Sequence, residues 1–166
     1  KNVLEIGAQG IIIPNTEKVS ALEAIVSNTI LKPNGNRGIG FSRSNNYGKY
    51  FNEYLKDSPP IIIPMIESLN GIKNCEEIIK YPMIDAVFIG PYDLSTSLGC
   101  SGDFENVKFK KAIKKILTTS KKYNKACGIH IIEPSKKLLQ KRIKEGYSFL
   151  AYSLDSVILR KSIELE

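Results

Sequence analysis

The segment Ala86-Val87-Phe88-Ile89-Gly90-Pro91-Tyr92-Asp93-Leu94-Ser95 is a short apolar run that ends abruptly in an acid. The segment before it, Pro60-Ile61-Ile62-Ile63-Pro64-Met65-Ile66-Glu67, has the same form. Runs of β-branched and aromatic residues without polar alternation are typical of strands buried on both faces, as in parallel sheets covered by helices. The two segments therefore predict a β-α-β unit with Glu67 and Asp93 at the carboxyl ends of neighbouring strands, the edge where α/β folds bind ligands.

Two carboxylates at one sheet edge repel each other unless a cation lies between them. Mg²⁺ is a suitable cation, because it is commonly held by one or two carboxylates and keeps other positions for water and substrate oxygens. The alternative is structural: each acid caps the helix that follows its strand, since Glu67 precedes Ser68 and Asp93 precedes Ser95. Spacing leaves both interpretations open.

Composition indicates a globular protein. The chain has 166 residues, of which 42% are hydrophobic and 25% charged, and these values fit one domain with its own core. Its formal net charge of +7 is compatible with a polyanionic partner. The lysines, however, are spread through the expected helices without an arginine-rich stripe, so we predict no nucleic-acid binding and interpret the charge as a solvated surface or a preference for anionic small substrates.

The cysteines and the hydropathy pattern bear on location. Cys75, Cys100 and Cys127 are odd in number and form no CxxC pair, which favours a reducing cytosol over a disulfide framework or a zinc site. No apolar run approaches the roughly 18 residues of a membrane span, and the first residues carry no signal-peptide core. We therefore expect a cytoplasmic protein with no membrane contact.

Hydrophobic periodicity predicts five strands, each followed by a helix. The predicted strands are 11–14, 61–66, 86–89, 126–132 and 149–152. The helices are predicted after an Asn15 or Thr16 cap, over 68–79, through the lysine-rich segment around 109–117, over 135–146 and over 157–165. Alternating units of this kind indicate a parallel sheet, open or closed.

A complete (β/α)₈ TIM barrel takes about 250 residues. We therefore expect residues 1–166 to be a single, partial TIM-barrel domain that holds the last five β-α units, without the first three. A doubly wound sheet is the competing fold. It requires a glycine-rich phosphate turn after the first strand, where this chain has Pro14-Asn15-Thr16.

Two further features have functional alternatives. The polar and aromatic excursion that begins at Arg37 and continues past Tyr54 is long for a compact domain, which indicates a functional loop or a contact with another subunit. His130, the only histidine, lies near a predicted strand end and is interpreted as structural more readily than as catalytic.

Four ordered segments resemble the HpcH/HpaI aldolase family, the metal-dependent 2-keto-3-deoxy sugar acid and 4-hydroxy-2-oxo acid aldolases of the phosphoenolpyruvate/pyruvate barrel superfamily. They are Glu5-Ile6-Gly7-Ala8-Gln9-Gly10-Ile11-Ile12-Ile13-Pro14, Arg37-Gly38-Ile39-Gly40, Ile66-Glu67 and Phe88-Ile89-Gly90-Pro91-Tyr92-Asp93-Leu94-Ser95. Their order and separations also agree with the family, and the resemblance covers nearly the whole chain.

The resemblance implies a class II pyruvate aldolase, an aldehyde-lyase that cleaves such acids to pyruvate and a small aldehyde. A divalent ion, Mg²⁺ or else Mn²⁺ or Co²⁺, would be held by Glu67 and Asp93 and would stabilise the pyruvate enolate as a Lewis acid. Backbone N–H groups from Gly90 to Asp93, chiefly those of Tyr92 and Asp93, would receive the pyruvate carboxylate. Glu5 stands where the family has an acid that supports the catalytic base of a neighbouring subunit, so a homo-oligomer is expected.

The chain also departs from the family pattern. Met65 stands where the family usually has glutamine and cannot donate a hydrogen bond. The family's catalytic histidine and enolate-stabilising arginine lie before the segment matched by Glu5, and His130 does not match that base. Two alternatives therefore remain, an inactive barrel that serves as a binding or assembly module and a citrate-lyase-like CoA-thioester lyase. The short turn that contains Tyr92 favours the aldolase over the lyase.

Overall fold

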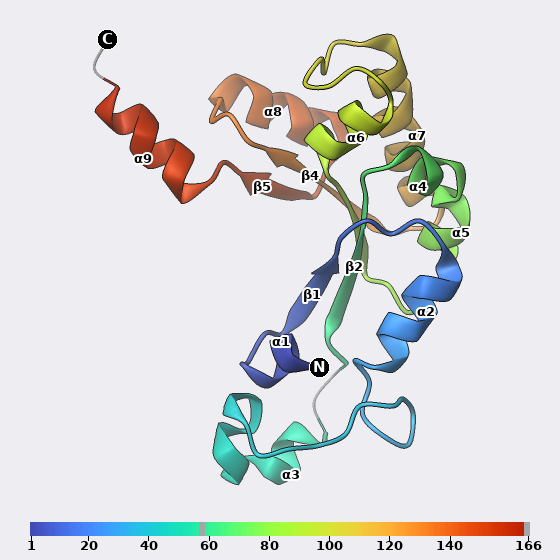
Figure 1. The fold of residues 1–166 in the computed structure, drawn as a ribbon, viewed down its shortest axis with the longest axis vertical. Coiled ribbons are helices and arrows are strands. Elements are labelled where there is room, and N and C mark those ends of the chain that lie inside the picture. Colours follow the sequence, from blue (N-terminus) through green and yellow to red (C-terminus); the bar gives the residue numbers. More distant parts are fainter. Residues whose placement is uncertain (57–58, 165–166) are drawn as a thin grey trace.

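The structure is a computed structural model, and it describes residues 1–56 and 59–164. Five parallel strands pair in chain order into one curled sheet, a half-barrel (Figure 1). They are β1 (Gly10–Ile13), β2 (Ile61–Ile66), β3 (Ala86–Ile89), β4 (Ala126–Ile131) and β5 (Phe149–Tyr152). The predicted strands are thus confirmed to within a residue or so. A doubly wound sheet is excluded for the described residues, because that fold reverses its strand order at a switch point.

Helices follow every strand. They are α2 (Val19–Ser27) after β1; α4 (Leu69–Lys73) and α5 (Cys75–Lys80) after β2; α6 (Pro91–Ser97) and α7 (Val107–Lys122) after β3; α8 (Lys136–Glu145) after β4; and α9 (Asp155–Ile163) after β5. Three short elements complete the described chain: α1 (Asn2–Glu5), the 3₁₀ helix η1 (Arg43–Gly48) and α3 (Phe51–Tyr54). In Figure 1, α2, α4, α5 and α7 lie on the same side of the sheet.

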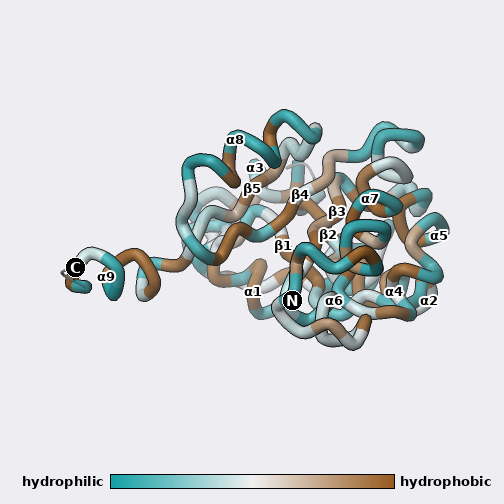
Figure 2. The backbone as a smooth tube through the Cα atoms, turned by 90° about the horizontal axis from the view of Figure 1, so that it is seen from above, coloured by the Kyte–Doolittle hydropathy of each residue, from teal (hydrophilic) through white to brown (hydrophobic). Residues whose placement is uncertain are grey.

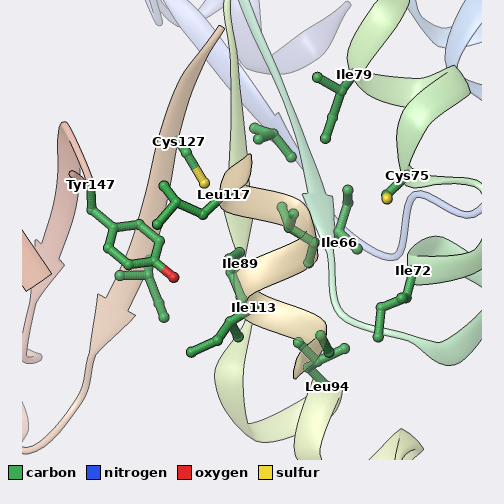
Figure 3. Packing of buried hydrophobic residues seen from close by; sticks show 14 of the residues in the cluster. Ile66, Ile72, Cys75, Ile79, Ile89, Leu94, Ile113, Leu117, Cys127 and Tyr147 are labelled. Atoms are coloured by element: carbon green, nitrogen blue, oxygen red, sulfur yellow. The ribbon is translucent and has the colours of Figure 1, made fainter. Parts of the chain in front are cut away.

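The core lies between the sheet and these helices (Figure 3). Ile66 of β2 and Ile89 of β3 point toward α7, whose Phe109 and Ile116 are fully buried against them. Because side chains alternate along a strand, Met65 and Phe88 point to the opposite side, called here the inner face. The same alternation places Glu67, two residues after Met65, on the inner face.

The last unit contributes less to the core. None of the residues of α8 or α9 is buried, and Ile158, Leu159 and Ile163 of α9 are 48%, 62% and 67% exposed. Figure 2 shows α9 extending away from the rest of the chain. None of the helices in the described ranges has the length and apolar character of a membrane span.

Several local predictions were wrong. Lys18, not Asn15 or Thr16, is the N-cap of α2, and it makes no side-chain capping bond. The helix predicted over 68–79 is two helices, because the Asn74 side chain donates to the Glu17 carbonyl at 2.7 Å, where the first helix ends. Leu69, whose helical spacing within this segment predicts an inward-facing side chain, is 43% exposed.

The helix ends also differ from the predictions. The last helix begins at Asp155 instead of at 157, and its predicted end at 165 lies outside the described residues. The helix over 135–146 is confirmed, with Ser135 accepting from the Leu138 N–H and Gly146 in the left-handed conformation at the end.

Candidate functional site

Glu67 and Asp93 lie at the same edge of the sheet. Glu67 directly follows β2, and Asp93 is the third residue of α6, which starts immediately after Gly90 at the end of β3. β2 and β3 are paired neighbours, with Ile66 opposite Ile89. The acids therefore follow adjacent parallel strands, as the sequence predicts.

Glu67 is held by a main-chain donor from another part of the chain. The Asn15 N–H donates to Glu67 Oε1 at 2.6 Å. Asn15 has a φ of 47°, a left-handed conformation that asparagine tolerates better than most residues. Ser68, not Glu67, caps α4, because its Oγ accepts from the Gly71 N–H at 3.1 Å. The capping interpretation of Glu67 is therefore wrong.

The loop after β1 is fixed against the segment that follows Glu67. The Thr16 N–H donates to the Met65 carbonyl at 3.0 Å, and Ser68 Oγ donates to the Glu17 carboxylate at 2.5 Å. The Ser68 bond and a longer one from Asn70 hold the pKa of Glu17 below its usual value. These contacts secure the position of the Asn15 N–H, and through it the orientation of Glu67.

The two acids influence each other electrostatically. Partial burial raises the pKa of Glu67; the Asn15 hydrogen bond opposes this shift, and the negative charge of Asp93 adds to it. In the described part of the chain, no group of three or more histidine, cysteine or acidic side chains forms a metal-binding cluster. The site therefore offers two carboxylates, a donor set that suits an ion which keeps its remaining positions for water and substrate oxygens.

Gly90 leaves the space that the Glu67 carboxylate occupies. A Cβ at this position would overlap Glu67 Oε2 and would lie 3.0 Å from Glu67 Cβ and 3.2 Å from Met65 Sδ. Met65 thus lies beside Gly90 and Glu67, and it brings a thioether in place of a polar group.

We expect Gly90→Ala to lower the affinity for Mn²⁺ by at least about tenfold and to cost about 1–3 kcal/mol of stability, because the added methyl displaces Glu67 in a packed site. Gly38→Ala is the matched control, since a Cβ there has Lys1 Nζ, 4.0 Å away, as its nearest neighbour. Calorimetric titration with Mn²⁺ and thermal unfolding measure the two effects. An unchanged affinity in Gly90→Ala would contradict the placement of Glu67.

The N–H groups expected to receive a carboxylate lie at the start of α6. Those of Tyr92 and Asp93 belong to its first turn and have no hydrogen-bond partner among residues 1–56 and 59–164. The Tyr92 ring is 43% exposed and packs edge-on against Phe104, with centroids 5.0 Å apart. The segment predicted as a short turn is the beginning of a helix.

Glu5 lies elsewhere. It ends α1, before the amino end of β1, whereas Glu67 and Asp93 lie at the carboxyl edge. Its carboxylate pairs with Arg37 at 3.2 Å, and Arg37 also donates to the Tyr54 hydroxyl at 2.5 Å. One chain therefore does not bring Glu5 to the acid pair, and its role toward a neighbouring subunit stays a prediction.

His130 lies on the inner face. In the pairing of β3 with β4, Phe88 lies opposite Gly128. Two residues further along each strand, the same register places His130 opposite Gly90. Its Nε2 lies 3.2 Å from the Ser153 carbonyl, which is consistent with the structural interpretation.

Comparisons with known proteins agree with this architecture. A family model described as HpcH/HpaI aldolase/citrate lyase matches residues 1–162. A hydroxypyruvate/pyruvate aldolase of Chromohalobacter salexigens is 30% identical, over 98% of this chain and 64% of the relative. A 2-keto-3-deoxy-L-rhamnonate aldolase of Salmonella paratyphi B is 29% identical, over 99% of this chain and 62% of the relative.

A solved structure is also similar. The crystal structure of an HpcH/HpaI aldolase/citrate lyase family protein from Burkholderia cenocepacia superposes with a TM-score of 0.89 and 27% identity, over 96% of this chain and 64% of that one. The chain spans less than two-thirds of the length of these relatives. With its family model, its relatives and its five parallel β-α units in agreement, the chain belongs to the HpcH/HpaI aldolase/citrate lyase family.

Proposed function

We propose that this chain provides the metal- and pyruvate-binding half of a class II pyruvate aldolase. The observation that carries the proposal is the pair of acids on adjacent strand ends, with Glu67 oriented by the Asn15 N–H and influenced by the charge of Asp93. The relatives named as pyruvate and 2-keto-3-deoxy-L-rhamnonate aldolases support the same reaction class.

Glu67 and Asp93 are the residues that would hold the divalent ion, Mg²⁺, Mn²⁺ or Co²⁺. The Asn15 N–H engages Glu67 Oε1, whereas Oε2 lies on the side of Gly90 and β3. A bound ion supplies Lewis-acid stabilisation of the pyruvate enolate. The ion would also remove the repulsion between the two carboxylates. The site with a bound cation is therefore expected to be more stable than the site with two unpaired anions.

The start of α6 would receive the carboxylate of pyruvate. The N–H groups of Tyr92 and Asp93 are aligned with the positive end of the helix and have no partner in the described chain. Met65 offers no hydrogen bond at its position, so pyruvate orientation would depend on the main chain and not on a side-chain amide.

Turnover needs more than these residues. The base and arginine expected from the family have no match in this chain, and loss of a proton-transfer group typically costs roughly 10²–10⁴ in rate. We propose that three further β-α units complete the barrel against the open edges of β1 and β5, and that a homo-oligomer brings Glu5 to a neighbouring site. The aldehyde partner would enter on the inner face.

Metal and ligand titration tests the proposal. Calorimetry with Mn²⁺, followed by pyruvate or its analogue oxamate, is expected to show that the organic acid binds only after the metal. An assay of pyruvate release and oxaloacetate decarboxylation then separates an active aldolase from an inactive binding module. Binding of pyruvate without metal, or no binding of either, would overturn the proposal.

The raised pKa of Glu67 predicts a pH dependence. A carboxyl whose pKa is raised on folding adds stability below its unfolded pKa and loses that contribution as the pH rises through the folded pKa. We therefore expect metal-free Glu67→Gln to unfold at a higher temperature than wild type at pH 7, with the difference fading toward pH 4.

Mn²⁺ competes with the proton for Glu67, so the affinity of wild type is expected to fall as the pH drops through the raised pKa. Calorimetric titrations between pH 4 and 8 measure this effect. An affinity that does not fall toward pH 4 would contradict Glu67 as a ligand.

A further inference from the structure

A groove of about 410 Å³ lies between α7 and α8, apart from the acid pair. Its floor is apolar and includes Ile113 and Leu117 of α7, beside Tyr147, which follows α8 (Figure 3). The groove faces away from the inner face, because α7 packs on the helix-covered side of the sheet. Its volume falls within the range of small-molecule sites in proteins.

The walls of the groove are cationic. Five basic side chains and two acids line it. The acids are already paired, Glu105 with Lys110 and Glu145 with Arg142 at 2.8 Å. Lys121 is also engaged, since its Nζ donates to the Glu145 carbonyl at 3.0 Å.

Two lysines on opposite walls remain available. Lys114 of α7 and Lys141 of α8 line the groove, and within residues 1–56 and 59–164 neither ammonium has an ion pair or a hydrogen bond. Lys141 contributes to the lowered pKa of Glu105, after the larger effect of Lys110, so a cation of α8 acts across the groove on an acid that precedes α7.

The floor also carries a polar group without a partner. Tyr147 lines the groove and is 4% exposed as a whole residue, and its hydroxyl makes no hydrogen bond to another described residue. Burial raises its pKa far above the usual value, so the hydroxyl stays protonated and can donate. The Tyr147 hydroxyl is not one of the fully enclosed polar atoms of the described residues, so it is open to the groove, where the acceptor of a ligand can replace water.

We propose that this groove binds a small organic anion with an apolar body, such as a medium-chain or aromatic carboxylate. The apolar part would lie on Ile113 and Leu117, and the carboxylate would accept from the Tyr147 hydroxyl and from the ammonium groups of Lys114 and Lys141. The ligand needs both its apolar body and its carboxylate. An inorganic anion would leave the apolar floor without a contact, and a neutral ligand would leave the two ammonium groups unpaired.

Octanoate is a suitable probe, with octanol as its neutral counterpart. We expect octanoate to bind the wild-type chain at one saturable site with a Kd below about 1 mM, and octanol to bind at least about tenfold more weakly. Amide chemical-shift changes should concentrate on α7, α8 and Tyr147.

Matched variants test the residues. Lys114→Gln/Lys141→Gln is expected to weaken octanoate at least about tenfold, and Tyr147→Phe by about three- to tenfold. Lys111→Gln/Lys136→Gln removes two lysines from the same helices outside the groove and should change the affinity less than about twofold, because exposed distant charges are screened. Both double variants remove the same charge, so a difference between them cannot come from net charge alone.

The proposal is overturned by three results: no saturable octanoate binding, equal affinity in the two double variants, or shift changes that concentrate on the exposed apolar residues of α9. Tyr147→Phe removes a hydroxyl with no partner in the described chain and is expected to fold normally, so it tests the site even if a lysine variant loses stability. Octanoate binding in the groove is expected to be independent of Mn²⁺, so its success or failure can be distinguished from that of the proposed aldolase site.

Discussion

Asp93→Asn and Glu67→Gln are each expected to lower Mn²⁺ affinity by at least about 100-fold, because each removes one of two carboxylate ligands. When Mn²⁺ no longer binds, the metal-dependent binding of pyruvate or oxamate should also be lost. Neither change alters the volume of the side chain, so the fold should persist. Calorimetric titration measures the metal and ligand affinities, and circular dichroism verifies the fold.

Glu77→Gln is the matched control for these variants. Glu77 lies on α5, is exposed and makes no ion pair with any described residue. It changes the net charge by the same amount as Glu67→Gln, so a general electrostatic effect would weaken Mn²⁺ equally in both. Equal affinities in Glu67→Gln, Asp93→Asn and wild type would eliminate the proposed metal site.

Phe109→Ala is expected to lower the free energy of unfolding by about 3–5 kcal/mol. Phe109 is fully buried in the main core, and its ring contacts Phe104 with centroids 5.2 Å apart. Its removal leaves a cavity between α7 and the sheet that rigid strands cannot close. Because domains are stable by only about 5–15 kcal/mol, this loss is a large part of the total.

Urea unfolding followed by circular dichroism measures the change in stability. Val107→Ala is the control on the same helix, since Val107 is 64% exposed, and it should cost less than about 0.5 kcal/mol. A loss in Phe109→Ala no larger than in Val107→Ala would mean that α7 does not pack on the sheet as described.

The strands could be predicted because their signal is local. Apolar runs such as 61–66 and 86–89 are bounded by proline, glycine or acids, and a buried parallel strand needs little else. The same reasoning placed Glu67 and Asp93 on one edge, because parallel strands that follow each other in a sheet end on the same side.

The remaining errors come from contacts between distant residues. The break at Asn74 depends on its bond to the Glu17 carbonyl, 57 positions away, and no local pattern reveals it. Leu69 follows helical periodicity, but it is the first residue of α4 and stays exposed, whereas Ile72 of the same helix is in the core. The donor to Glu67 was missed for a different reason: it is a peptide N–H, and the asparagine that supplies it resembled a helix cap.

Because the donor to Glu67 is a peptide N–H, the side chain at position 15 can change during evolution. What Glu67 requires of position 15 is a backbone shape and not a functional group, so glycine or aspartate should substitute there while a β-branched residue should not. Distant members could thus preserve the same carboxylate geometry with no identical residue at this position, and a search for invariant side chains would overlook the element that aims the acid.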